Sequence, residues 1–202
     1  MTKKKKDKYE KYWKYDGSRF KSDSQWFAFL RSNLRKGWNT HFMKLEKLKQ
    51  VKKKIPNPNP KSAARFPEVF GAQCEICSCT YPLSAGKKEA RNKDYIVIDH
   101  IHAAGAFNEI EHVQKFFERM FCVTLDDLRA VCTSCNSTLA YADKQGISFE
   151  EAKCEKEAKA IVDAKEEKVW LLERNILPAS AQANRRKQIV EQLKKERGIE
   201  TI

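Results

Sequence analysis

The chain has 202 residues and a formal net charge of +13, with 40 Lys and Arg against 27 Asp and Glu. This length fits one domain of ordinary size, or a small core with added helices. No apolar run approaches the roughly 20 residues that cross a bilayer, and no apolar signal core follows the N-terminus. These features argue against a membrane protein, and we expect a soluble, cytoplasmic one.

The positive charge is concentrated in the N-terminal part of the chain. Residues 1–60 hold 18 basic and 5 acidic residues, whereas residues 61–202 hold 22 of each. Aromatic residues such as Tyr9, Tyr12 and Trp13 alternate with lysines there. Because ammonium groups bind phosphates and flat rings stack on bases, this arm favours a DNA contact over a solubilising tail. The arm begins with four consecutive lysines, Lys3, Lys4, Lys5 and Lys6.

Two helices are predicted next, followed by a proline-rich segment. Ser22 with Gln25 three residues later is typical of a helix start, and apolar residues follow at helical spacing. A second helical pattern runs from Phe42 to Val51. Residues 55–60 contain three prolines at alternate positions, which cannot continue a helix. We interpret residues 55–60 as a linker, so that residues 1–60 form the first part of the chain.

Residues 61–145 contain most of the cysteines, and residues 146–202 are helical in pattern. Short β-rich stretches at 95–98 and 128–131 predict two strands. Ser148 with Glu151 forms a capping box that starts one helix, closed by Asn175 and Pro178. A last helix is expected from about residue 180 to 197, before Gly198. The predicted fold class is α+β, mainly α, in three parts: 1–60, 61–145 and 146–202.

Four of the seven cysteines form two C-x-x-C pairs, about fifty residues apart. Two such pairs can place four thiolates around one Zn²⁺ in a tetrahedral shell, and a shell of four protein ligands is typical of a structural zinc. Cys79 competes for a ligand position, whereas Cys122 and Cys154 are interpreted as thiols without a metal role. The predicted zinc ligands are Cys74, Cys77, Cys132 and Cys135.

An acid, an imidazole and an amide lie in and beside this cysteine frame. Asp99 and His100 end the predicted strand, and Asn136 directly follows the last cysteine of the frame. Hydrolysis of a phosphodiester needs a base to activate water and a divalent cation to neutralise developing charge. His100 can be the base near neutral pH. Asp99 and Asn136 offer hard oxygen ligands for Mg²⁺ or Mn²⁺.

The pattern C-x-x-C, D-H, C-x-x-C-N resembles the four-cysteine, phage-type subgroup of the HNH (ββα-metal) endonucleases, in particular the recombination endonuclease VII type. The resemblance is strongest over residues 70–142 and covers about half of the chain. It implies a small zinc-stapled ββα-metal core with flanking helices and hydrolysis of DNA. It also implies that His100 is the general base and that Asp99 and Asn136 bind the catalytic ion.

The resemblance adds further residues and one departure. The Asn that orients the base in the family falls at about Asp127, whose extra charge would raise the pKa of the imidazole. His102 matches a second histidine of the family pattern, and it is either a substrate contact or a structural polar residue. Arg129 either contacts a DNA phosphate or pairs with Asp126 or Asp127. The family's acidic position one turn after Asn136 is Leu139, which argues against a resolvase-type activity.

Three functions compete: a DNA endonuclease, a zinc-stapled DNA-binding module without activity, and a structural interaction protein. The acid, base and hard ligands favour the endonuclease, because a binding module does not need them. Each site of this kind cuts one strand, so a double-strand break would use a homodimer or two passes. The resemblance also points to a phage-encoded protein, with other phage proteins as further partners.

Overall fold

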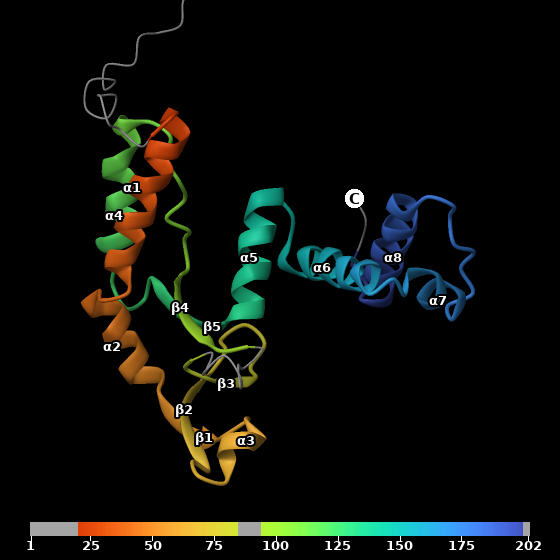
Figure 1. The fold of residues 1–202 in the computed structure, drawn as a ribbon, viewed down its shortest axis with the longest axis horizontal. Helices are drawn as coiled ribbons and strands as arrows, with labels where there is room; N and C mark the ends of the chain where they lie inside the picture. Colours follow the sequence, from red (N-terminus) through yellow and green to blue (C-terminus); the bar gives the residue numbers. More distant parts are fainter. Residues whose placement is uncertain (1–19, 85–93, 200–202) are drawn as a thin grey trace, which may run out of the picture. The chain divides into compact units, whose positions relative to one another are not determined.

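The computed structural model describes residues 20–84 and 94–199, and it divides the chain into two compact units (Figure 1). The first unit ends at Cys132, and the second begins at Thr133. The boundaries predicted at residues 60 and 145 stay predictions.

The first unit begins with two helices. In α1, Asp23–Trp38, the N-cap Ser22 accepts a hydrogen bond at its Oγ from the backbone N–H of Gln25, 3.3 Å away. The side chain of Gln25 in turn accepts one from the backbone N–H of Lys21 at 2.8 Å. The predicted helix start is therefore confirmed. The second helix, α2, spans Phe42–Val51 as expected.

A three-stranded antiparallel sheet, which the sequence patterns do not predict, follows α2. Its strands are β1, Lys53–Pro56, β2, Glu68–Gln73, and β3, Thr80–Pro82, in the order β1-β2-β3, with the short helix α3, Pro60–Ala63, between β1 and β2. The linker prediction is wrong at its start, because Ile55 lies in β1 and is only 7% exposed. At Gly71 in β2 an added Cβ would lie 2.3 Å from the Ile55 side chain and 2.6 Å from the Tyr81 carbonyl oxygen, so only glycine fits.

A second sheet pairs the two predicted strands. β4, Ile96–His100, is antiparallel to β5, Leu128–Cys132, with Ile98 opposite Ala130. Between them lie a 3₁₀ turn, Ile110–His112, and α4, Val113–Phe121, which runs beside α1 (Figure 1). Arg31 of α1 donates hydrogen bonds to the Phe107 carbonyl and the Asn108 side chain, which hold the segment before α4. The Phe107 ring is 1% exposed and lies edge-on between those of Phe27 and Phe116.

The second unit consists of four helices. They are α5, Thr133–Gln145, α6, Phe149–Asp163, α7, Glu167–Leu172, and α8, Gln182–Glu196. The core of this unit joins α6, α7 and α8 through six buried residues, Cys154, Ala158, Leu171, Ile189, Val190 and Leu193.

Three of the four helix boundaries considered in the second unit agree with the predictions. The capping box of Ser148 and Glu151 is confirmed at the start of α6. The last helix ends before Gly198, whose φ is +63°, as predicted. Asn175 follows α7 with a φ of +60°. The single helix predicted from Ser148 is wrong, because Lys165 takes a φ of +61° and separates α6 from α7.

The observed architecture is α+β, with small sheets and a majority of helical elements. Among the described residues, no helix has both the length and the apolar composition needed to cross a membrane.

Candidate metal centre and adjoining cavity

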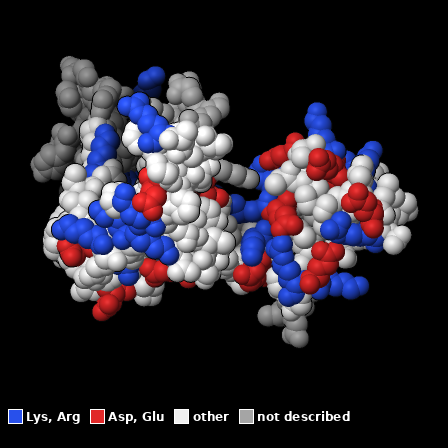
Figure 2. Space-filling view, turned by 90° about the horizontal axis from the view of Figure 1, so that it is seen from below, with Lys and Arg blue, Asp and Glu red and all other residues white. Residues whose placement is uncertain are grey.

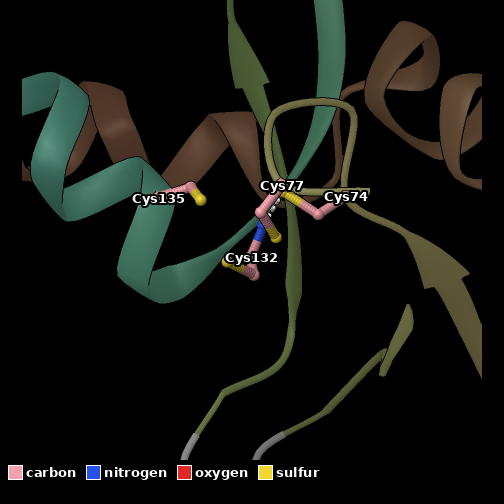
Figure 3. A group of neighbouring side chains, drawn as sticks. All are labelled: Cys74, Cys77, Cys132 and Cys135. Atoms are coloured by element: carbon pink, nitrogen blue, oxygen red, sulfur yellow. Dashed lines mark hydrogen bonds between the residues drawn. The ribbon is translucent and has the colours of Figure 1, made fainter. Parts of the chain in front are cut away.

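Four cysteine side chains converge on one point (Figure 3). They come from the turn after β2, the end of β5 and the first turn of α5, and their sulfur atoms all lie within 4.8 Å of one another. Three of the four residues are buried, and Cys77 is exposed. The cluster consists of Cys74, Cys77, Cys132 and Cys135, as the spacing predicted.

Backbone hydrogen bonds shape the first knuckle and tie it to β5. Cys74 donates its N–H to the Cys79 carbonyl at 2.8 Å, and Ser78 donates to the Cys74 carbonyl at 2.9 Å, with Ser78 at a φ of +59°. The Cys132 N–H points at the Cys74 sulfur, 3.3 Å away. Glu75 donates its backbone N–H to the Ala130 carbonyl, and its carboxylate accepts the Ala130 N–H, both at 2.8 Å. These hydrogen bonds join the knuckle to the edge of β5.

The cluster fits a structural zinc ion. A tetrahedron with zinc–sulfur bonds of about 2.3 Å has sulfur–sulfur edges of about 3.8 Å, so four sulfurs within 4.8 Å need only a small contraction. Four soft thiolates suit Zn²⁺ better than Mg²⁺ or Ca²⁺. The exposed thiol of Cys79 is not in the cluster, which settles the competition for a ligand position. Cys122 and Cys154 also lie outside it.

His100 is the last residue of β4, and its imidazole is buried, with the residue 7% exposed. Its Nε2 lies 3.1 Å from the backbone carbonyl oxygen of Met120 in α4. Because a carbonyl oxygen only accepts, Nε2 carries the proton and Nδ1 is left as the basic nitrogen. The ring of Trp38, at the end of α1, lies 4.1 Å from the imidazole between centroids. The imidazole is thus held in one tautomer and one orientation.

The surroundings of His100 favour its neutral form. Burial lowers the pKa of the imidazole, and this outweighs the contact with the Met120 carbonyl and the nearby Asp99 carboxylate, which raise it. A neutral imidazole near pH 7 can accept a proton, as a general base must.

Asp99 alternates with His100 along β4, so the two side chains leave opposite faces of the strand. Its Oδ2 lies 3.3 Å from Nη2 of Arg129, which is directly opposite in β5. Of the two roles left open for Arg129, the ion pair is made with Asp99 across the strands and not with Asp126 or Asp127, and the phosphate contact stays a prediction. Arg129 also places its Nη2 3.5 Å from the His100 carbonyl oxygen, which fixes the guanidinium beside the strand end.

Asp127 makes different contacts from those expected of a residue that orients the base. Its Oδ2 accepts hydrogen bonds from the backbone N–H and the hydroxyl of Thr124, both at 2.8 Å. These two bonds, that of the N–H first, hold the pKa of Asp127 below its usual value. The hydrogen bond on the imidazole instead involves the backbone of Met120. Asp127 thus shapes the turn before β5, and its carbonyl accepts the N–H of Ile101 at 2.8 Å.

A cavity of about 300 Å³ opens beside the imidazole and brings three predicted residues together. His100, His102 and Asp127 line it, together with two charged residues of α4, Glu118 and Arg119. Asp99 and Arg129 are not among its lining residues. Sequence reasoning missed Glu118 and Arg119, because they are two of many charged residues on an amphipathic helix and no spacing rule links α4 to β4. The cavity also has Cys122 and Val123 in its wall.

The roles of the remaining predicted site residues stay predictions. Asn136 is half-buried in the first turn of α5 and directly follows Cys135. It belongs to the second unit, and its role with Asp99 and His100 stays a prediction. Lys3, Lys4, Lys5 and Lys6 lie outside the described residues.

The chain was compared with protein-family models, with curated proteins and with solved structures. No family model, no curated protein and no solved structure matches it.

Proposed function

We propose that the protein is a metal-dependent DNA endonuclease of the HNH (ββα-metal) kind, with zinc in the four-cysteine cluster as a structural ion. One observation carries the proposal: a buried imidazole, held at Nε2 by a backbone carbonyl, lies in the wall of a cavity at the end of a strand. Core histidines do not usually face a cavity that also contains charged side chains. A histidine that accepts a proton from water during hydrolysis needs this arrangement.

The local chain order supports the same proposal. Strand β4 ends in the Asp99–His100 pair, its antiparallel partner β5 ends in the first thiolate of the second knuckle, and helix α5 follows without a gap. This is the strand, strand, helix order that the sequence resemblance implies, with α4 inserted between the strands. A zinc ion in the cluster would fix the end of β5, because Cys132 belongs to both.

His100 would perform the proton transfer. Its Nδ1 accepts a proton from a water molecule while Nε2–H continues to donate to Met120, so the ring does not need to turn during the reaction. The carbonyl also stabilises the imidazolium once it forms, because a carbonyl oxygen attracts the N–H of a cation more strongly. The expected products carry 5′-phosphate and 3′-hydroxyl ends.

The chemistry of Asp99 and Asn136 fits a hard divalent cation such as Mg²⁺ or Mn²⁺, which prefers carboxylate and amide oxygens. When bound, such an ion neutralises the charge that develops on the phosphate and the leaving oxygen. Asp99 already faces Arg129 through Oδ2, so Arg129 and the ion would share this carboxylate. We assign Arg129 the role of keeping the carboxylate in place at the end of β4.

That ion pair also gives the second candidate function its support. A carboxylate whose Oδ2 lies 3.3 Å from a guanidinium is stable without an ion. A zinc-stapled DNA-binding module with no activity would keep this ion pair intact and would bind DNA through its basic residues alone.

Plasmid nicking separates the two candidates. Zinc-loaded protein is incubated with supercoiled plasmid in the presence of Mg²⁺, of Mn²⁺ or of neither, and the ends are then mapped. We expect nicking only with an added ion, and a loss of at least about a hundredfold in His100→Ala, the low end of what a general base contributes.

The matched control is His112→Ala, because His112 is exposed and pairs only loosely with Glu109 at 3.9 Å. This variant should cut at the parent rate, and His100→Ala should still bind DNA in a mobility-shift assay. Cleavage by His100→Ala at the parent rate would show that His100 is not the general base. Absence of cleavage by the parent with either ion would favour the binding module.

A further inference from the structure

Exposed aromatic rings lie beside cations at two places in the β1–β2 hairpin, on the paired strands themselves and in the loop just before β2. Phe66 and Phe70 are 54% and 48% exposed, whereas Phe27, Phe107 and Phe116 of the same unit are at most 5% exposed. Side chains of this size normally bury their rings, so exposed rings of this kind often mark a binding surface. We name the hairpin patch by its five residues, Lys52, Lys54, Arg65, Phe66 and Phe70.

Each ring in the hairpin patch lies against a cation. The ammonium groups of Lys52 and Lys54 lie 4.4 and 4.9 Å from the centroid of Phe70, and Lys54 is directly opposite Phe70 in the β1–β2 register. The guanidinium carbon of Arg65 lies 5.2 Å from the centroid of Phe66. These are cation–π distances. Because Lys54 and Phe70 are register partners, the sheet fixes the spacing of that cation and that ring, whereas Arg65 and Phe66 lie in the loop before β2.

The charge around these rings is almost entirely positive. Residues 52–70 include five basic residues and one acidic residue. Figure 2 looks at the molecule from the end where β1 and α3 lie in Figure 1, and it shows Lys and Arg side chains gathered on this part of the first unit with only scattered Asp and Glu. A polyanion is therefore the complementary partner.

We infer that the hairpin patch binds a DNA strand with accessible bases, its phosphates on Lys52, Lys54 and Arg65 and its bases against Phe66 and Phe70. Phosphates alone would account for the cations but leave the exposed rings without a function. Flat rings beside ammonium groups match the alternation of base and phosphate along a single strand. An acidic protein surface offers carboxylates but no stacking planes, so it matches the patch less well. The choice of DNA over RNA rests on the proposed function.

Ring substitutions test the stacking contact in the full-length protein. Phe66→Leu/Phe70→Leu keeps apolar side chains of similar size but removes the planes, and Phe66→Tyr/Phe70→Tyr keeps them. Binding of a labelled single-stranded oligodeoxynucleotide is measured by fluorescence anisotropy, in buffer without added Mg²⁺ or Mn²⁺ so that no cleavage occurs. We expect the Leu variant to bind about tenfold or more weakly and the Tyr variant to bind within about twofold of the parent.

An abasic strand of the same length separates stacking from a change in the fold. Without bases, the parent and the Leu variant should bind equally, because only the phosphate contacts remain. Equal affinity of the parent and the Leu variant for the normal strand would overturn the inference. So would a Leu variant that loses the same affinity for the abasic strand, because the loss would then be structural.

Charge substitutions test the phosphate contacts. Lys52→Gln/Lys54→Gln should lower the slope of log affinity against log salt by about 1.4, since each phosphate contact on a single strand contributes about 0.7. The control is Lys153→Gln/Lys168→Gln, which removes two exposed lysines of the second unit and should leave the slope unchanged. Equal slopes in the two double variants would contradict a phosphate contact at β1.

Competitors test the identity of the partner. Unlabelled single-stranded DNA should displace the probe at lower concentration than duplex DNA, a matched RNA or poly-glutamate. Stronger displacement by poly-glutamate would favour an acidic protein, and stronger displacement by duplex or RNA would contradict the choice of an unpaired DNA strand. None of these measurements depends on cleavage, so the hairpin patch can bind DNA even if His100 proves inactive, and the nuclease can be active even if the patch does not bind.

Discussion

The first unit, residues 1–132, and the second unit, residues 133–202, stabilise their folds by different means. The strands of the first unit are three to six residues long, and the turn after β2 is joined to β5 by the cysteine cluster. The second unit packs two helices of 15 residues, α6 and α8, around buried apolar side chains. Both units bury apolar side chains, but the short strands of the first unit are also joined through a candidate metal site, whereas the α6–α8 core is closed by side-chain packing. We therefore expect the first unit to depend on a metal ion more than the second.

The two units also differ in where their ion pairs lie. Between α6 and α8, Lys194 lies 2.7 Å from Glu151 and Arg186 lies 2.6 Å from Glu155. In the first unit, the pair at the strand end, Asp99 with Arg129, lies beside the proposed active site. We infer that the ion pairs of the second unit contribute to stability, whereas the pair of the first unit contributes to function.

Replacement of a cluster cysteine is expected to have the largest effect. Cys74→Ser removes a buried ligand that also accepts the N–H of Cys132. Structural zinc contributes about 10–16 kcal/mol of apparent binding free energy in small zinc domains, more than most domains have in total stability. The strands of the first unit should lose protection in hydrogen-exchange mass spectrometry, and bound zinc should fall from one ion per chain to none.

The control for this prediction is Cys79→Ser, because Cys79 is exposed and lies outside the cluster. It should keep its zinc and its protection. Peptides from α6 and α8 should stay protected in Cys74→Ser, and their simultaneous loss would show that the two units do not differ as proposed.

The converse substitution removes a core side chain of the second unit. Ile189 is fully buried among the α6, α7 and α8 residues, so Ile189→Ala should cost about 2–5 kcal/mol through lost burial and a residual cavity. Urea unfolding followed by hydrogen exchange should show the loss in α6 and α8, with the zinc content unchanged. Loss of zinc from this variant would mean that the cluster depends on the helical core.

The two units also differ in how far sequence alone predicts them. In the second unit the helix ends depend on local rules, so Ser148 with Glu151 and the left-handed Gly198 could be read directly. The break between α6 and α7 at Lys165 could not be predicted. Lysine is not a residue that favours a positive φ, and its neighbours in the sequence give no helix-end signal. The cysteine spacing also predicted the cluster, whose ligand Cys135 belongs to the second unit, because two C-x-x-C pairs can place four thiolates around one ion.

The sheet and the cavity of the first unit needed the structure. The sequence predicts the end of a helix and the start of a linker near residues 53–56, but this segment forms β1, and its pairing with β2 depends on contacts that no local pattern encodes. His100 donates its Nε2–H to the backbone carbonyl of Met120. Every residue has such a carbonyl, so the sequence does not indicate which one the imidazole contacts. The sequence resemblance therefore implies that Asp127 orients the imidazole, whereas the carbonyl of Met120 makes that contact.

A smaller effect is expected at the start of α6. Ser148 accepts a hydrogen bond at Oγ from the Glu151 N–H at 3.2 Å, so Ser148→Ala leaves one N–H of the first turn without its cap. The loss should be about 1 kcal/mol. Differential scanning calorimetry of the parent, Ser148→Ala and Ser148→Asp should rank the alanine variant lowest, with aspartate near the parent because it also caps helices. A drop in zinc content would contradict a purely local effect.

The smallest effect concerns the pH dependence of the second unit. The hydrogen bond from Lys194, followed by those from Ser148, lowers the pKa of Glu151 from its ordinary value of 4.5 to about 2. A carboxylate with a lowered pKa in the folded protein stabilises it fully above about pH 4.5, and this contribution is lost as the pH falls through about 2. Glu151→Gln still accepts hydrogen bonds but has no charge for Lys194, so its urea midpoint at pH 7 should lie slightly below that of the parent. The gap should close as the pH is lowered toward 2, and hydrogen exchange of α6 amides reports it separately from the acid-sensitive zinc cluster. A gap that stays constant over this range would show that Glu151 acts through its shape at the N-terminus of α6, with its charge contributing nothing.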